Sequence, residues 1–369
     1  MRIAISTGGG DAPGLNAVIR AAALTALRRD WTVVGIRDGF DGLMFPGRYG
    51  EPGTIGAGCY ELTRDIIRGI GHLGGTVLGS TNRGNPVAYP VQGPDGLWTT
   101  EDRSDQLVEM FRLSGIDALI TIGGDGSLAI GRRLNEAGLR VIGVPKTIDN
   151  DLDQTDTTFG FDTAVNVATE GIDRLFTTAT SHSRLFVVEV MGRYAGWIAL
   201  HAGLAAGAHG ILIPEIPFDL ESVATMIRRR EARGARFAIV VVAEGATARD
   251  GRRMVTGQSI GQAERLGGIG AFVAAELEHR TGKEARTVVL GHLLRGGSPS
   301  GLDRVLGLRF GAAAVRALEE GHDGVMVALR SQRIEYVSLA DAVSRMRTVP
   351  LDGDTIASAR DIGISFGEA

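Results

Sequence analysis

Six short apolar segments of the sequence each end in a cluster of glycines or polar residues. The segments span residues 2–6, 118–122, 141–144, 185–190, 237–243 and 287–290. Amphipathic helical patterns lie between them, as at residues 15–27 and 162–181. Strands that alternate with helices form right-handed crossovers and a parallel sheet, and their continuous apolar character requires cover on both faces. The pattern therefore predicts an α/β fold with mostly parallel strands.

The clusters after these strands are expected to share one site, because ligands bind at the carboxyl ends of parallel strands. Glycine makes up 54 of the 369 residues, about twice an average share, and much of it falls in these clusters. We place a change of domain near residues 141–145. Residues 83–105 have the composition of a surface loop, and the tail after about residue 347 shows no strong pattern.

The composition excludes several classes of protein. The single cysteine, Cys59, cannot form an intrachain disulfide or a cysteine-based metal cluster, which favours a reducing cytoplasm. We expect neither secretion nor membrane insertion, because no apolar run approaches the length of a membrane span and the amino terminus lacks a signal pattern. The net charge of −4, with no block of Lys and Arg, argues against nucleic acid as a partner.

The first cluster, residues 8–14, places glycines between a strand and a helix. Backbone N–H groups can approach a phosphate there, and the amino terminus of the helix attracts an anion. The cluster is neither a Walker A loop, which closes with Lys-Ser/Thr, nor a GxGxxG motif. A tight turn without a ligand is the alternative interpretation.

The second cluster, residues 123–127, sets Asp125 between Gly124 and Gly126. A carboxylate beside a closely approaching backbone suits a magnesium nucleotide, since the amides can hold phosphate oxygens while the carboxylate reaches the metal through water. The alternative is that Asp125 is the N-cap of the next helix.

The third cluster, residues 145–151, carries two carboxylates, Asp149 and Asp151, beside Lys146 and Thr147. Phosphoryl transfer needs a carboxylate near the acceptor hydroxyl and positive charge on the transferring oxygens. We predict that Asp149 is the general base. A solvated acidic turn is the alternative.

The remaining strand ends carry residues that could contact a sugar phosphate. Those placed for polar contacts to a sugar are Met191, Gly192, Arg193 and Glu244. Those that supply positive charge for a second phosphate are Arg184, Arg286, His292 and Arg295. Each arginine could instead be a surface ion-pair partner, and the histidine a hydrogen-bonded structural residue.

Five segments together resemble the 6-phosphofructokinases: GGGDAPGLNAVIR (8–20), GGDGS (123–127), PKTIDND (145–151), VEVMGRYAGW (188–197) and GHLLRGGSPS (291–300). The resemblance runs in one collinear order from residue 2 to about residue 345. The combination, with Lys146, is most similar to an actinobacterial type that groups with mixed ATP- and pyrophosphate-using enzymes. The resemblance implies Mg²⁺-dependent phosphoryl transfer to the 1-hydroxyl of fructose 6-phosphate, the committed step of glycolysis.

The resemblance also implies roles for particular residues. Asp149 resembles the proton acceptor, and Asp125 the Mg²⁺ ligand. Further catalytic residues would be Thr147, Asp151 and Arg193. The donor site would comprise Gly10, Arg83, Gly124, Asp125, Gly126 and Ser127. The sugar phosphate site would comprise Thr147, Ile148, Asp149, Arg184, Met191, Gly192, Arg193, Glu244, Arg286, His292, Leu293, Leu294 and Arg295.

Two of these arginines, Arg184 and Arg286, are expected to reach the site of a neighbouring subunit. The resemblance therefore implies a homo-oligomer, usually a tetramer, with sites shared between subunits.

The two markers of the phosphoryl donor disagree. Gly126 favours ATP, because the Asp that marks pyrophosphate users at this place is a steric and electrostatic veto on a nucleotide. Lys146 is typical of pyrophosphate enzymes, but its point charge could serve either donor. We therefore predict ATP, with a reversible pyrophosphate-dependent enzyme as the main alternative. Remoter alternatives are a lipid or NAD kinase that shares GGDG and a non-catalytic sugar-phosphate-binding regulator.

The predicted architecture is two Rossmann-like three-layer αβα domains with mostly parallel sheets and the site in the cleft between them. Residues 1–140 and about 294–345 would form the donor domain, and residues 141–293 the sugar-phosphate domain. Residues 346–369 would be a tail of unknown role. The predicted partners are ATP and fructose 6-phosphate in the cytoplasm, without a membrane or nucleic acid.

Overall fold

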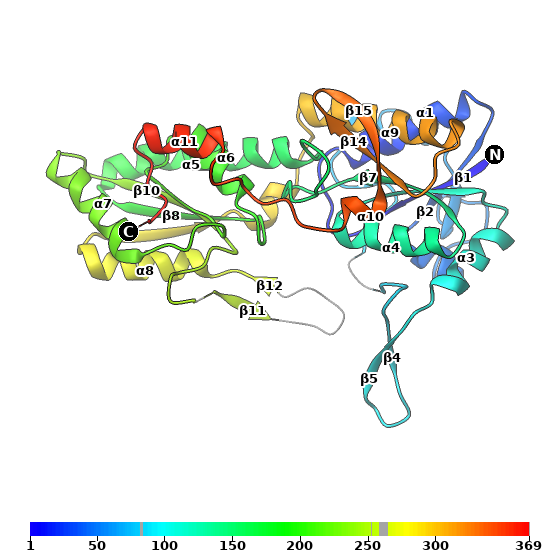
Figure 1. Ribbon diagram of the computed structural model, residues 1–369, viewed down its shortest axis with the longest axis horizontal. Helices are drawn as coiled ribbons and strands as arrows, with labels where there is room; N and C mark the ends of the chain where they lie inside the picture. Colours follow the sequence, from blue (N-terminus) through cyan, green and yellow to red (C-terminus); the bar gives the residue numbers. More distant parts are fainter. Residues whose placement is uncertain (82–83, 252, 258–264, 369) are drawn as a thin grey trace.

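The computed structural model describes residues 1–81, 84–251, 253–257 and 265–368. These residues form two layered units, each with a β-sheet between helices, that lie side by side along the long axis of the molecule (Figure 1). Within the described ranges, no helix is both long and apolar enough to cross a membrane.

The larger sheet has seven strands in the order β15-β14-β7-β6-β1-β2-β3. Its central strands are parallel, and β15 and β3 pair antiparallel at the two edges. The strand bounds are β1 (Arg2–Thr7), β2 (Thr32–Ile36), β3 (Cys59–Glu61), β6 (Ala118–Gly123), β7 (Arg140–Pro145), β14 (Val325–Arg330) and β15 (Arg333–Ser338). This topology brings β14, from late in the chain, beside β7.

Helices cover both faces of the larger sheet. Helices α1 (Leu15–Leu27) and α9 (Gly301–Glu319) lie on one face, and α3 (Ser104–Leu113), α4 (Asp125–Glu136) and α10 (Leu339–Ala342) lie on the other. Successive residues of a strand point to opposite faces, so Ile3 and Ile5 pack toward α1 and α9 while Ala4 packs toward α3 and α4. Burial on both faces explains the continuous apolar runs in the sequence.

The smaller sheet has four parallel strands in the order β13-β8-β10-β9. The strand bounds are β8 (Leu185–Val190), β9 (Gly210–Leu212), β10 (Ala238–Ala243) and β13 (Ala285–Val289). One face is covered by α5 (Phe161–His182), α6 (Trp197–Ala205) and α11 (Asp354–Asp361), and the other by α7 (Leu220–Ala232) and α8 (Ile269–Thr281). The predicted α/β fold with mostly parallel sheets is confirmed, and all six predicted strands are present.

The division of the chain between the two sheets differs in detail from the sequence prediction. Strand β7 pairs with β6 and β14, so the change of sheet falls after Pro145 and not at residue 141. The pairing with β14 is non-local, and no local pattern in the sequence indicates it. The assignment of the two units to donor and sugar phosphate stays a prediction.

Two segments of weak sequence pattern are ordered elements in the structure. Residues 83–105 contain the antiparallel hairpin of β4 (Tyr89–Gln92) and β5 (Trp98–Glu101), which projects away from the larger unit in Figure 1. In the tail, Ile356 and Ala359 of α11 are fully buried against the smaller unit. The remaining short elements are α2 (Asp41–Met44), η1 (Pro46–Arg48), η2 (Ile70–His72), β11 (Val255–Gly257), β12 (Arg265–Leu266) and η3 (Gly291–Arg295).

Candidate active site

A cavity of about 820 Å³ is lined by residues of both units. The segments after β1, β6, β7, β8, β10 and β13 all contribute to its wall. This agrees with the prediction that the polar clusters after these strands share one site. Predicted site residues that line it are Gly10, Gly124, Asp125, Gly126, Ser127, Lys146, Thr147, Asp149, Asp151, Met191, Arg193, Glu244, His292 and Arg295. The clusters of donor, base and sugar candidates therefore meet in one place.

The segment after β7 holds Asp149 in the wall of this cavity. Asp149 is only 5% exposed, and its Oδ1 has no hydrogen-bond partner among the described residues. Its backbone N–H donates to Thr147 Oγ1 at 3.0 Å. The turn is fixed by Asn150, which has a left-handed φ of 54° and whose Oδ1 accepts from the backbone N–H of Thr158 at 3.1 Å. The carboxylate is therefore buried, rigidly presented and available to a ligand, and the solvated acidic turn is not what the structure shows.

Opposing effects act on the carboxylates of this segment. Burial raises the pKa of Asp149, because a carboxylate loses its hydration there, while the positive charges of Arg295, Arg193 and Lys146 lower it. Burial, followed by repulsion from Asp149, raises the pKa of Asp151 to about 7. The net effect raises the pKa of Asp149 above the ordinary value of an aspartate, although the cations hold it lower than burial alone would.

The second glycine cluster forms the start of helix α4. Gly124 occupies the N-cap position without a side-chain cap, so Asp125 is the first residue of the helix and does not cap it. A Cβ on Gly123 would lie 2.2 Å from Ser127 Cβ, and one on Gly8 would lie 2.6 Å from Ser127 Oγ. These two glycines are required because the turns pack closely around Ser127. The free amino terminus of α4 and Asp125 both face the cavity.

Lys146 connects the first and third clusters. Its ammonium donates to the backbone oxygen of Gly10, and the side chain is buried at 3% exposure. Burial, together with the nearby positive charge of Arg295, lowers the pKa of Lys146 to about 8. Lys146 thus lies between the first glycine loop and the base segment.

The wall of the cavity that carries the predicted sugar-contacting residues is built by the segments after β8 and β10. The backbone N–H of Arg193 donates to Glu244 Oε1 at 3.2 Å, and Arg193 itself has a left-handed φ of 47°. A Cβ on Gly245 would lie 1.7 Å from the backbone oxygen of Arg193, so glycine is needed for the two loops to approach. Burial raises the pKa of Glu244 to about 7.

Arg295 reaches across from the segment after β13 to the first glycine loop. Its Nη1 donates to the backbone oxygen of Asp11 at 3.0 Å, and a Cβ on Gly10 would lie 3.0 Å from the same nitrogen. Arg295 also has the largest electrostatic effect on Asp149 of the cations around it. Arg295 is therefore placed between the first glycine loop and Asp149.

Several predicted residues do not line the cavity. Arg184 and Arg286 lie at the opposite, amino-terminal ends of β8 and β13, where both pair with Glu284. Ile148 and Leu294 are buried in the apolar core, Leu293 is exposed, and Gly192 is not part of the cavity wall. Arg83 lies outside the described residues.

The cavity wall also contains residues that were not singled out from the sequence, among them Asp11, Tyr194 and Met346. Asp11 belongs to the first glycine cluster and could have been found there, and Tyr194 stands within the segment GRYAGW. Met346 comes from the tail, and nothing in its local sequence indicates a place beside the cavity.

The fold and the site define a two-unit α/β protein whose cavity joins glycine turns to a buried carboxylate. The model of the family described as phosphofructokinase matches residues 2–318, and the chain belongs to this family.

Individual relatives agree with this membership. The chain is 51% identical to the ATP-dependent 6-phosphofructokinase of Chloroflexus aggregans, over 100% of this chain and 98% of that protein. It is 49% identical to the pyrophosphate--fructose 6-phosphate 1-phosphotransferase of Amycolatopsis mediterranei, over 95% of this chain and 97% of that protein. The structure of phosphofructokinase from Saccharomyces cerevisiae superposes with a TM-score of 0.77 at 28% identity, covering 99% of this chain and 48% of the yeast chain. This chain thus spans about half of the yeast chain.

Proposed function

We propose that the protein is an ATP-dependent 6-phosphofructokinase, which transfers the γ-phosphoryl group of ATP to the 1-hydroxyl of fructose 6-phosphate. The products are fructose 1,6-bisphosphate and ADP, and the reaction is the committed step of glycolysis. The observation that carries the proposal is the buried Asp149, whose Oδ1 has no hydrogen-bond partner in the described part of the chain, in a cavity shared by two glycine turns and the loops after β8 and β10. Relatives of nearly full-length similarity that bear this name support it.

Asp149 is the proposed general base. It accepts the proton of the 1-hydroxyl as the oxygen attacks the phosphorus atom, and the bond from that phosphorus to the bridging oxygen of ADP breaks. Arg193, Arg295 and Lys146 favour the ionised carboxylate and supply positive charge close to the transferring group. Met191, Arg193, Glu244 and His292 would hold the sugar phosphate.

The donor would lie against the glycine turns around Ser127 and the amino terminus of α4. A Cβ on Gly126 would meet no atom within 4 Å, so the space beside Asp125 is open to a nucleotide. Lys146 and the Amycolatopsis relative favour the second candidate, a reversible pyrophosphate-dependent enzyme. We choose ATP because Gly126 leaves this space unobstructed.

Mg²⁺ fits the residues of the cavity. Asp125 supplies a hard carboxylate oxygen of the kind this ion prefers, and Asp149 and Asp151 line the same cavity. In the part of the chain that the structure describes, no group of three or more His, Cys, Asp or Glu could hold a metal by itself. We therefore expect Asp125 to hold Mg²⁺ together with phosphate oxygens of the donor. The ion would neutralise charge on the transferring phosphoryl group.

Initial rates with two donors test the proposed function. Purified protein with fructose 6-phosphate and Mg²⁺ is expected to form fructose 1,6-bisphosphate with ATP and much more slowly, or not at all, with pyrophosphate. Activity with pyrophosphate alone would establish the second candidate. Activity with neither donor would refute both and favour the sugar-phosphate-binding regulator.

Arg184 and Arg286 would complete the phosphate site of a neighbouring subunit in a homo-oligomer, which we take to be a tetramer. Both guanidinium groups are held by Glu284 at the far end of the smaller sheet. If the site is shared, coexpressed Arg184→Ala and Asp149→Asn chains should regain activity that neither has alone, because some sites then combine an intact base with an intact neighbouring arginine.

The matched control for this mixture places both substitutions in one chain. Coexpression of Asp149→Asn with the double variant Asp149→Asn/Arg184→Ala leaves no subunit with an intact base, so no activity should return. Failure of the first mixture to recover any activity, with mixed oligomers present, would contradict a shared site.

A cytoplasmic location and the lack of membrane or nucleic-acid partners stay predictions from the sequence.

A further inference from the structure

Residues 345–349, which we name the strap, connect the two units beside the cavity. The chain leaves α10 of the larger unit, passes through the strap, and reaches α11 of the smaller unit (Figure 1). The strap runs antiparallel to the base segment, with Met346 bridged to Leu152. The backbone N–H of Arg347 donates to the backbone oxygen of Asp151 at 2.8 Å. The strap therefore lies directly against the segment that carries Asp149.

The side chain of Arg347 contacts both the segment after β7 and helix α6. Its Nη1 donates to the backbone oxygen of Asn150 at 3.3 Å, and its guanidinium lies over the Trp197 ring, 4.3 Å from the centroid. Trp197 Nε1 donates back to the backbone oxygen of Arg347 at 3.1 Å. Trp197 begins α6, directly after the acceptor loop that carries Arg193. One residue thus contacts the base segment and the end of the acceptor loop.

A partly buried carboxylate, that of Glu215, makes a second connection. Glu215 Oε1 accepts from the backbone N–H of Val349 at 2.9 Å and from that of Gly196 at 3.0 Å. Val349 is 3% exposed in the core of the smaller unit. The strap and the acceptor loop are therefore joined at two successive points, Trp197 and Gly196.

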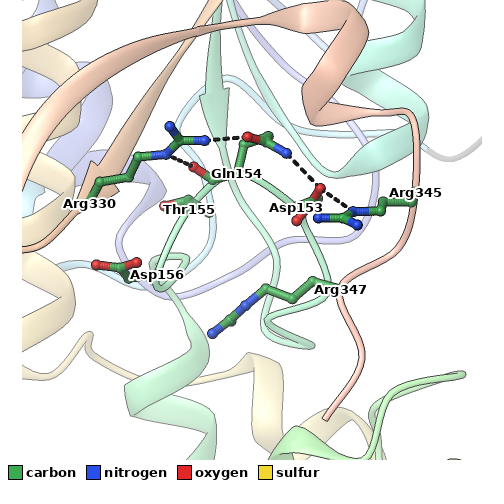
Figure 2. A pocket seen from close by; sticks show the side chains of 7 residues that line it. All are labelled: Asp153, Gln154, Thr155, Asp156, Arg330, Arg345 and Arg347. Atoms are coloured by element: carbon green, nitrogen blue, oxygen red, sulfur yellow. Dashed lines mark hydrogen bonds and ion pairs between the residues drawn. The ribbon is translucent and has the colours of Figure 1, made fainter. Parts of the chain in front are cut away.

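The outer face of the strap is a shallow cavity of about 280 Å³ that includes three arginines (Figure 2). Two of these are held by protein groups: Arg345 pairs with Asp153 at 2.6 Å, and Arg330 donates to the side chain and backbone of Gln154. Figure 2 shows these bonds along one line of side chains, with Arg347 pointing away from them. Arg345 thus attaches the strap to Asp153, and Arg330 of β14 attaches Gln154 to the larger unit, so neither arginine is free to hold an anion.

We propose that the strap positions the base against the acceptor and that Arg347 is its main positioning residue. The inference rests on the proposed function, in which Asp149 and Arg193 act on the same substrate from separate segments. A displacement of about 1 Å between reacting groups can lower a rate on the order of 100-fold. Arg347 contacts the residue after Asp149 and the helix that follows Arg193, so it fixes the relative position of the two.

The test compares Arg347→Ala with a matched arginine elsewhere in the tail. Arg347→Ala is expected to lower kcat by roughly 10- to 100-fold with KM values changed far less. Misplacement of Asp149 relative to Arg193 reduces stabilisation of the transition state more than it reduces binding of the substrates. The control is Arg360→Ala, since Arg360 also lies over an aromatic ring, that of Phe366, and forms an ion pair with Glu368. Its contacts remain within the smaller unit, so kcat should stay near that of the parent protein.

A second readout does not depend on activity. Hydrogen exchange of the backbone amides in residues 147–153 and 193–197 should become faster in Arg347→Ala and stay unchanged in Arg360→Ala. Arg347→Lys should give an intermediate kcat, because lysine keeps the charge but loses the planar stack. If Arg347→Ala does not fold, Arg347→Lys and Trp197→Phe provide the same comparison, since phenylalanine keeps a ring but removes the indole donor.

The outcomes separate the two proposals. An unchanged kcat in Arg347→Ala, or unchanged exchange in both segments, would overturn the positioning role. A loss of kcat accompanied by an equal rise in exchange throughout the protein would also overturn it, because that result indicates general destabilisation. If the parent protein has no phosphofructokinase activity, the proposed function fails, and the exchange comparison still decides whether the strap holds the two segments.

Discussion

Asp149→Asn is expected to lower kcat by about 10²- to 10⁴-fold while the KM values for both substrates change little. Asparagine has the shape of the aspartate and can keep the backbone bond from residue 149 to Thr147 Oγ1. It cannot accept a proton from the 1-hydroxyl. The loss therefore falls on the transition state, where proton transfer occurs, and steady-state kinetics with Mg-ATP and fructose 6-phosphate measures it.

The control for the change of charge is Asp173→Asn, on the exposed side of α5. This variant loses the same charge far from the cavity and should keep the parental kcat. Near-parental turnover in Asp149→Asn would contradict the assignment of the base. Asp151 would then be the next candidate, because it also lines the cavity and burial raises its pKa to about 7.

The sequence allowed us to predict that the three clusters after β1, β6 and β7 lie close together, because parallel strands bring their carboxyl ends to one edge of the sheet. Gly10, Asp125 and Asp149 each follow an apolar run, and runs of this kind end at the same edge of a parallel sheet. The prediction needed only the local order of strand, loop and helix along the chain. It did not need the order of the strands in the sheet.

Features that depend on distant pairing could not be predicted in the same way. Strand β7 pairs with β6 on one side and with β14, far along the chain, on the other, and the sequence carries no local signal for the second pairing. Met346 and Arg347 lie beside the cavity because the tail crosses back between the units, and their local sequence has neither periodicity nor a motif. Hairpin β4–β5 was missed because its strands are short and largely exposed, so they lack a buried apolar face.

The electrostatic state of the site also required the structure. The sequence shows that Asp149, Lys146 and Arg295 exist, but burial determines how strongly each charge acts. Lys146 is 3% exposed and its pKa falls to about 8, whereas an exposed lysine would keep its ordinary value. The sequence identifies these residues as charged but does not indicate how deeply each side chain is buried.

Gly126→Asp is expected to suppress the use of ATP by roughly 100-fold or more while affecting pyrophosphate use much less. A Cβ at this position meets no atom within 4 Å, so the new side chain requires no shift of the backbone. It would place a second carboxylate beside Asp125 in the wall of the cavity, at the start of α4. That group would occupy space needed by a nucleotide and repel its phosphates. Initial rates with each donor, at saturating fructose 6-phosphate, measure the ratio.

Gly126→Asn separates the two causes of this effect. Asparagine has nearly the same volume as aspartate but no charge, so equal loss of ATP use in both variants would make the block steric. A loss confined to Gly126→Asp would make it electrostatic, because the two side chains differ mainly in charge. Equal loss of both donors in Gly126→Asp would contradict the role of Gly126 in donor choice. Lys146, which bonds to Gly10 between the donor loop and the base, would then be the residue to test.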